Sequence, residues 1–340
     1  MSQDGCLGPD AGEPRPVLID AEVLSNEAIS HALYETVFRA PELALKARPA
    51  QFIGVKVSTG RDPFLRRPFS IARVDRNRGT VGILWARVGY GTELMSRWRP
   101  GETVNLLGPL GNGFRPRRFK HLILVAGGTG IAPMPFVCAE SLKENPAASV
   151  TLLYGAKDKN SMYPVHRLMQ ETPWLAVQVS TEDGSYGKKG LVTGLLEDCL
   201  TRVLSQNREG DCDASSTFVS ARKNPGDAGD TRNEASGPGI LVFACGPKGM
   251  LSAVKAITTS AKIPLYVSLE ERMACGLGLC RGCAVRRARG FKLEDPLDPV
   301  GQLGTGGSYP GWSSSRVGDS YFHVCLDGPV FSAEDVDLEG

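Results

Sequence analysis

The feature that most constrains this chain is a group of closely spaced cysteines in its C-terminal part. Cys275, Cys280 and Cys283 fall within nine residues, and Cys325 follows after 41 more. The sequence has nine cysteines in all, at uneven spacing, and its first residues form neither the basic nor the apolar segment of a secretory signal. We therefore expect a cytoplasmic protein, in which structural disulfides are rare. The four cysteines then need another explanation.

The spacing C-x4-C-x2-C with one distant cysteine matches the plant-type arrangement in which four thiolates hold a [2Fe–2S] cluster. Three ligands would lie on one loop, where Gly276, Gly278 and Gly282 let the backbone turn tightly and direct N–H groups at the sulfurs. Two alternatives remain open. One is a four-cysteine zinc site, which usually presents two short cysteine pairs. The other is a set of buried thiols without a metal.

Composition narrows the classes of protein to consider. Of 340 residues, 41% are apolar and 22% are charged, which is enough for more than one buried core. The formal net charge of +2 argues against bulk electrostatic binding to nucleic acid or to an anionic membrane. The longest apolar region, residues 121–139, is interrupted by glycines and prolines, so we expect no membrane span.

The order of the predicted elements indicates a mixed β and α/β protein with three domains. Residues 16–115 contain short apolar segments broken by Gly, Pro and Arg, which predicts a small antiparallel β-barrel. Residues 118–264 alternate strands and helices, which predicts a parallel α/β sheet with ligands at the strand C-termini. Residues 265–335 form a small domain around the cysteines. Polar stretches at about residues 200–238 and 295–318 are predicted to be surface insertions, the first of them disordered.

Two segments of the predicted barrel could hold a flavin. An arginine beside a strand can pair with a pyrophosphate, an aromatic side chain can lie along a flavin ring, and a serine can hydrogen-bond the ring edge. The first segment consists of Arg67, Pro68, Phe69 and Ser70. By itself this segment reads more simply as an ordinary amphipathic strand. The second segment strengthens the flavin interpretation. It contains Leu84, Trp85 and Ala86 and then Gly91 and Thr92. Thr92 is predicted to cap a helix over residues 93–98, whose N-terminus could receive a phosphate.

Turns that contain glycine follow two apolar strands of the predicted α/β domain. The first turn consists of Gly127, Gly128, Thr129 and Gly130. It is not the G-x-G-x-x-G fingerprint, but it too would let a pyrophosphate approach the start of the next helix. The second turn consists of Cys245, Gly246 and Pro247. For Cys245, a small buried thiol that closes a core strand is the simpler interpretation.

An acidic turn after a further strand bears on the choice of nucleotide. Glu182 or Asp183 could hold a ribose 2′-hydroxyl and so favour NAD over NADP, although a solvated turn explains residues 181–185 equally well. None of the four histidines lies in a metal-ligand or catalytic-triad pattern, and the sequence contains no nucleophile elbow.

Taken in order, the motifs RPFS, GYGT, GGTGIAP, ACGP, SLEERMACGLGLCRGC and CLDGPVF resemble those of the electron-transfer subunits of NAD-dependent dihydroorotate dehydrogenases, within the ferredoxin-reductase-like superfamily. The resemblance implies that residues 67–70, residues 84–86, Gly91 and Thr92 bind FAD. Ala86 stands where this family tends to have a basic residue. The two glycine-containing turns would line the NAD site, and the four cysteines would ligate the cluster.

The resemblance also implies a partner and a reaction. Dihydroorotate would be oxidised at FMN in a separate catalytic subunit, in a hetero-oligomer of heterotetrameric type, and electrons would pass through the cluster and FAD to NAD in pyrimidine biosynthesis. No residue suggests an orotate site, so we expect no catalytic residue of that kind in this chain. A related alternative is a diaphorase-type subunit of a hydrogenase, a sulfite reductase or a ferredoxin:NAD(P) oxidoreductase. An alternative of another class is a zinc-stabilised adaptor without redox activity.

Overall fold

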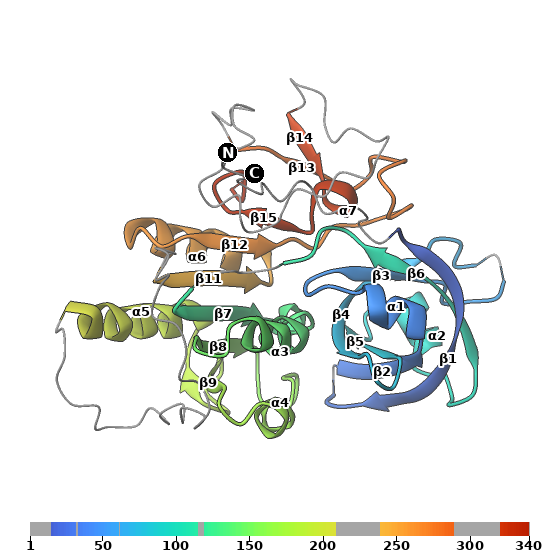
Figure 1. The fold of residues 1–340 in the computed structure, drawn as a ribbon, viewed down its shortest axis with the longest axis horizontal. Helices are drawn as coiled ribbons and strands as arrows, with labels where there is room; N and C mark the ends of the chain where they lie inside the picture. The colour runs from blue at the N-terminus through green and yellow to red at the C-terminus, as the bar shows by residue number, and fades with distance from the viewer. Residues whose placement is uncertain are drawn as a thin grey trace, which may run out of the picture.

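A barrel, a parallel sheet and a cysteine-containing segment follow one another along the chain (Figure 1). The computed structural model describes residues 15–31, 33–60, 62–114, 119–208, 239–288 and 320–339. In Figure 1 the barrel lies at the right and the sheet at the left, and the last strands and helix lie above them. The expected β and α/β architecture is confirmed.

The barrel is closed and antiparallel, with strand order β1-β2-β5-β4-β3-β6 and β6 paired again with β1. Its strands are β1 (Val17–Ala28), β2 (Leu33–Arg39), β3 (Phe52–Val55), β4 (Arg67–Asp75), β5 (Thr80–Ala86) and β6 (Thr103–Leu110). Alternation along β1 shows why the barrel closes: Ala21 and Val23 are buried, whereas Asp20 and Glu22 are exposed. Two short helices, α1 (Pro41–Lys46) and α2 (Tyr90–Met95), connect its strands.

The second part is a seven-stranded sheet in the order β10-β9-β8-β7-β11-β12-β15. Its strands are β7 (His121–Gly127), β8 (Ser149–Ala156), β9 (Ala176–Thr181), β10 (Lys188–Lys189), β11 (Ile240–Cys245), β12 (Leu265–Ser268) and β15 (Val330–Ser332). All neighbouring pairs are parallel except β12 with β15. From β7 the chain first adds β8 and β9 on one side and then crosses to β11 on the other. The topological switch point, where such sheets bind ligands, therefore lies between β7 and β11.

Helices cover both faces of this sheet. They are η1 (Gly128–Ile131), a 3-10 turn, and the α-helices α3 (Met134–Glu144), α4 (Val165–Glu171), α5 (Val192–Arg208) and α6 (Lys248–Ser260). Side chains of α3 and α4 share a core with barrel residues such as Ala72 and Leu84, so this face is turned toward the barrel. Side chains of α5 and α6 pack on the opposite face with those of the cysteine-containing segment.

The cysteine-containing segment is fixed to both other parts. It includes β13 (Ala284–Arg286), β14 (Tyr321–His323) and α7 (Val324–Asp327), and β15 joins it to the sheet through β12. At the end of the barrel, the Asn112 N–H donates to the carbonyl oxygen of Gly328 (2.5 Å), and the Asn112 side-chain amide donates to that of Asp327 (2.9 Å). The segment thus lies at the junction of barrel and sheet.

The expected insertion at residues 200–238 needs one correction. Residues 200–208 continue α5, because Leu200 and Val203 extend the helix face that Leu196 buries against the sheet. Residues 209–238 and residues 295–318, the second expected insertion, lie outside the described residues. Within the part of the chain that the structure describes, no helix is both long and apolar enough to cross a membrane.

A chain of hydrogen bonds, one buried and the others half-buried, links α2 and the turn after it to the barrel wall. Trp85 Nε1 donates to Thr36 Oγ1 (2.8 Å), which in turn donates to Asn26 Oδ1 (2.7 Å). The side-chain amide of Asn26 then donates to the carbonyl oxygens of Met95 (2.9 Å) and Trp98 (3.2 Å) at the end of α2. Thr36 is therefore the link between β5 and the helix that follows it.

Replacing Thr36 by valine is expected to lower the free energy of unfolding by about 2 kcal/mol, because it leaves the buried Trp85 N–H without an acceptor and the half-buried Asn26 Oδ1 without its donor. Denaturant unfolding measures this change. The control is Thr201→Val on α5, where an exposed hydroxyl is removed and a change within about 0.5 kcal/mol is expected. Equal stability of the two variants would contradict the linking role of Thr36.

Candidate functional site

The first candidate segment, residues 67–70, lies where the barrel wall is open on one side. These residues pair with β3 along their whole length, but β4 pairs with β5 only from Ile71 onward. Among the described residues, the backbone edge of residues 67–70 that faces β5 has no ladder partner. All four residues are half-buried, and the Phe69 ring lies 6.5 Å from that of Trp85, centroid to centroid. An edge with free backbone groups beside a half-buried aromatic ring can hold a flat, polar-edged ligand.

The second candidate segment contributes mainly backbone. The side chains of Leu84 and Trp85 are buried, with Trp85 stacked on Tyr34 at a centroid distance of 4.5 Å, and Ala86 is half-buried. A Cβ on Gly91 would lie 3.1 Å from Arg67 Nε, so the start of α2 and Arg67 are close together. The two segments therefore meet at the same end of the barrel.

The predicted helix over residues 93–98 is wrong in its bounds, because α2 begins at Tyr90 with Gly89 as its N-cap. Thr92 lies inside the first turn. Its hydroxyl accepts hydrogen bonds from the N–H groups of Val88 (2.9 Å) and Gly89 (3.0 Å) and donates to the carbonyl oxygen of Gly89. Thr92 thus stabilises the first turn of α2 from within the helix and is not its N-cap.

The two glycine-containing turns meet at the switch point of the sheet. Cys245 pairs with Ala126, so the turns that follow β7 and β11 are neighbours. A Cβ on Gly130 would lie 2.0 Å from the carbonyl oxygen of Cys245, and one on Gly127 would lie 2.5 Å from Met250 Sδ. These close approaches require glycine. They place the backbone of both turns at the end of the sheet, beside the switch point between β7 and β11.

The thiol of Cys245 points into the core, as the simpler interpretation predicts. Its side chain is fully buried, and this burial raises its pKa, so the thiol stays protonated. Cys245 can therefore offer a ligand its backbone but not its thiol, and Pro247 beside it is exposed. Residues 182–185 of the acidic turn are exposed, whereas Thr181 is buried, and Asp183 accepts hydrogen bonds from the N–H (2.9 Å) and hydroxyl (2.7 Å) of Ser185.

The four cysteines come together, although 41 residues separate the last two. Cys280 hydrogen-bonds with Cys275, and Cys283 with Cys325, so the four sulfurs form two pairs. Within the described ranges, no three His, Cys, Asp or Glu side chains converge on a single-ion position. Backbone N–H groups of five residues donate to these sulfurs at 3.1–3.5 Å: Leu277, Gly278, Cys280, Gly282 and Cys325.

These hydrogen bonds favour thiolates. Donation by the Gly282 N–H lowers the pKa of the Cys280 thiol, and the hydrogen bond with Cys325 lowers that of Cys283 to about 6. The same contact raises the pKa of Cys325. Positive φ angles at Gly276 (70°), Gly278 (77°) and Arg281 (55°) bend the loop around the sulfurs. Deprotonated sulfurs with N–H donors are the ligands that iron requires.

The cysteine loop lies beside β4. Cys275 and Gly276 line the same cleft as Pro68 and Arg66, and a Cβ on Gly276 would lie 3.3 Å from Leu110 Cδ1. Sequence reasoning missed Arg66, whose only signal was its place next to Arg67. Its guanidinium donates to the carbonyl oxygens of Gly54 (3.3 Å) and Asn105 (3.0 Å) and to the side-chain oxygen of Asn105, and it forms one wall of the cleft.

Comparison with solved structures identifies the class of fold. A structure described as an NADH-dependent reduced ferredoxin-NADP oxidoreductase is similar, with a TM-score of 0.65 and 22% identity over 94% of this chain and 90% of that chain. The ferredoxin reductase of carbazole 1,9a-dioxygenase is also similar, with a TM-score of 0.57 and 18% identity over 74% of this chain and 69% of that one. The chain therefore has a ferredoxin-reductase-like fold.

Relatives identify the family. The family described as "Oxidoreductase NAD-binding domain" matches residues 124–256. The dihydroorotate dehydrogenase B (NAD(+)) electron transfer subunit of Desulforamulus reducens is 34% identical over 92% of this chain and 96% of its own length. That of Caldanaerobacter subterraneus subsp. tengcongensis is 31% identical over 93% and 97%. The chain belongs to this family of electron transfer subunits. The expected class, an NAD-linked oxidoreductase component, and the expected cofactors, FAD and a [2Fe–2S] cluster, are confirmed.

Replacing Gly130 by alanine is expected to lower the free energy of unfolding by about 1–3 kcal/mol and to weaken NADH binding, because the new Cβ would collide with the Cys245 carbonyl. Denaturant unfolding and fluorescence titration with NADH measure the two effects. The control is Gly194→Ala on α5, whose new Cβ would have no heavy atom within 4 Å, so neither quantity should fall. Normal NADH affinity and stability in Gly130→Ala would contradict the close packing of the two turns.

Proposed function

We propose that this chain receives electrons from a dihydroorotate-oxidising partner at its iron–sulfur centre and passes them through FAD to NAD. The observation that carries the proposal is the cleft that Cys275 and Gly276 share with Pro68 and Arg66. This cleft sets the cysteine loop directly beside the strand segment to which we assign FAD. Short separation between redox centres is what a transfer of single electrons needs.

We assign FAD to the open edge of β4 and the adjacent start of α2. Arg67 would bind the pyrophosphate, since a guanidinium donates two parallel hydrogen bonds to such a group. Phe69 and Ser70 would lie along the ring system, and the backbone of residues 84–86 would face it from the other strand. Gly91 leaves room for the phosphates beside Arg67, and Thr92 holds the turn in shape.

We assign NAD to the backbone of residues 127–130 and 245–247. Both turns end neighbouring parallel strands at the switch point, where a pyrophosphate can accept hydrogen bonds from N–H groups at the start of the following helices. The face of the sheet that carries α3 and α4 is turned toward the barrel, so a nucleotide at this point can extend toward the FAD strand. No side chain of this chain is assigned a catalytic role.

We assign the [2Fe–2S] cluster to Cys275, Cys280, Cys283 and Cys325. Two iron atoms that each take two thiolates match the two sulfur pairs and the C-x4-C-x2-C spacing with one distant cysteine. When bound, FAD exchanges a hydride with NAD and single electrons with the cluster. The N–H groups that donate to the sulfurs stabilise added negative charge there and so help the loop to accept an electron.

The family is one of subunits, and a subunit that transfers electrons works beside a catalytic one. We propose an FMN-containing dihydroorotate dehydrogenase as this partner, in a cytoplasmic heterotetramer. The exposed side of the cysteine loop supports a partner at this place: Leu279 is 60% exposed and Cys280 is exposed beside it. Electrons can enter there without crossing the protein interior.

Replacing Cys280 by serine is expected to abolish the EPR signal of the reduced cluster and lower the iron content while FAD stays bound. The fold should survive, because Cys280 is exposed. Cys199→Ala on α5 is the control, since that buried thiol is not one of the four assigned ligands and should not affect iron. EPR after dithionite reduction, metal analysis and flavin absorption measure the three quantities.

Electron transfer from the reduced partner to NAD tests the proposed direction of flow. It should be lost in Cys280→Ser and kept in Cys199→Ala. Full electron transfer in Cys280→Ser would contradict the cluster assignment. Stoichiometric zinc with no iron in the unmodified protein would contradict the redox function itself.

A further inference from the structure

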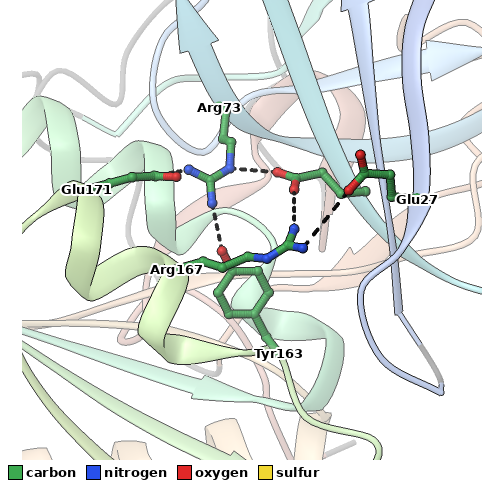
Figure 2. A network of polar contacts seen from close by, with 6 residues as sticks. Glu27, Arg73, Tyr163, Arg167 and Glu171 are labelled. Atoms are coloured by element: carbon green, nitrogen blue, oxygen red, sulfur yellow. Dashed lines mark hydrogen bonds and ion pairs between the residues drawn. The ribbon is translucent and has the colours of Figure 1, made fainter. Parts of the chain in front are cut away.

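One half-buried arginine joins the barrel to the sheet half, which consists of the parallel sheet and its helices, through several polar contacts (Figure 2). Arg73, on β4, donates from Nε to Glu35 of β2 (2.6 Å) and from one terminal nitrogen to the Tyr163 hydroxyl (2.6 Å). Its other terminal nitrogen pairs with Glu171, at the end of α4. Tyr163 and Glu171 belong to the sheet half, so a single guanidinium bridges the two halves.

A second layer of contacts supports this bridge. Arg167 of α4 donates to Glu35 (3.4 Å) and lies 4.0 Å from Glu27 of β1. The His31 N–H also donates to the carbonyl oxygen of Asn160 (3.1 Å). Glu35 is thus held by arginines from both halves, and its side chain is only 13% exposed. These are directional contacts at one place in the interface.

The network connects the two cofactor sites through the backbone. On one side, Arg73 follows Ser70 by three residues on the strand assigned to FAD. On the other side, the N–H of Tyr163 donates to the Tyr154 hydroxyl (3.0 Å), and Tyr154 pairs with Ala126, next to the glycine turn assigned to NAD. Burial raises the pKa of Tyr154 to about 12 and also raises that of Tyr163, so both phenols remain neutral donors and acceptors.

The rest of the interface combines apolar packing with one further ion pair, from Arg76 after β4 to Glu140 of α3 (2.9 Å). Phe136 of α3 packs into the barrel core, and Phe114 stacks on Phe243 at a centroid distance of 4.4 Å. Apolar contacts hold surfaces together without directional preference, whereas a guanidinium with three oriented partners fixes rotation and translation. Arg73 has oriented partners on all three guanidinium nitrogens and is less exposed than Arg76, so its network constrains the orientation of the two halves more strongly than the single Arg76 ion pair.

We propose that Arg73 is a positioning residue for hydride transfer. By fixing the sheet half against β4, it sets the distance and angle at which the nicotinamide meets the flavin. The inference rests on the proposed function, in which NADH gives a hydride, two electrons and one proton, to FAD and becomes NAD+, or the reverse. Hydride transfer requires reacting atoms about 3–3.5 Å apart, and a displacement of about 1 Å can slow such a step by about 100-fold.

The test is anaerobic stopped-flow reduction of the FAD-loaded protein by NADH. In Arg73→Gln we expect FAD and iron contents to stay normal while the limiting rate at saturating NADH falls by at least about tenfold. The long-wavelength absorption band of the stacked nicotinamide and flavin should weaken in parallel. Reduction by dithionite, which needs no nucleotide docking, should keep its wild-type rate.

Two variants separate position from charge and from general stability. Arg73→Lys keeps the charge but not the fork of donors, so its limiting rate should lie between those of the wild type and Arg73→Gln. Arg39→Gln is the control, because it removes an exposed arginine whose partner, Glu22, belongs to the same barrel, so that no contact between the two halves is lost. Its rate should not change. A wild-type rate in Arg73→Lys would mean that charge alone matters and would overturn the positioning role.

A wild-type limiting rate and absorption band in Arg73→Gln would also overturn the positioning role. If Arg73→Gln does not fold, Tyr163→Phe removes one hydroxyl of the same bridge. That variant should show a reduced limiting rate, and a wild-type rate would overturn the inference. Failure of NADH to reduce the unmodified protein would instead contradict the proposed function.

Discussion

The contact on which the rest of the structure depends is the one between the end of the barrel and the segment that carries Cys325. Gly111 has a φ of 72°, and a Cβ there would lie 2.6 Å from Pro329 Cδ and 2.7 Å from the Gly328 carbonyl oxygen. Asn112 then makes two hydrogen bonds to the same stretch of chain. Because β15 follows directly and pairs with β12, this segment is held by barrel and sheet at once. The cysteine loop therefore cannot move away from β4 without breaking both attachments.

The sites that we assign to the cofactors consist mostly of backbone groups. Leu84, Trp85 and Cys245 turn their side chains into the core, and the turn at residues 127–130 has no bulky side chain at its closest approaches. Backbone N–H groups also supply the hydrogen bonds to the cysteine sulfurs. At Gly127 and Gly130 a Cβ would lie 2.5 Å and 2.0 Å from neighbouring protein atoms, so the backbone can pack this closely only with glycine. The side chains that remain important are those that orient the parts, such as Arg67 and Arg73.

Much of the fold could be predicted because its signals are local. Apolar strands followed by glycine turns indicate the parallel sheet, and the spacing of Cys275, Cys280 and Cys283 indicates one loop with three sulfurs. The N-terminus of α2 was misplaced, because Thr92 resembles an N-cap but bonds back to Gly89 from within the helix. In α5, the polar residues near its end hid the apolar positions that continue the helix through residue 208.

The bridge at Arg73 could not be predicted from the sequence. An arginine in an amphipathic strand reads as a solvent-facing position, and its partners Tyr163 and Glu171 lie 90 and 98 residues away. Only the packing of the α4 region against the barrel brings them together. The same holds for Arg66, which is indistinguishable from a surface arginine until the cysteine loop is packed beside it.

The most direct test is an anaerobic titration of the purified chain with NADH, followed by flavin absorption and by EPR of frozen samples. Bleaching of the flavin together with a reduced [2Fe–2S] signal is predicted, because the NAD, FAD and cluster sites are in sequence within one chain. Bleaching of the flavin with an intact cluster that dithionite reduces and NADH does not would contradict electron transfer between β4 and the cysteine loop.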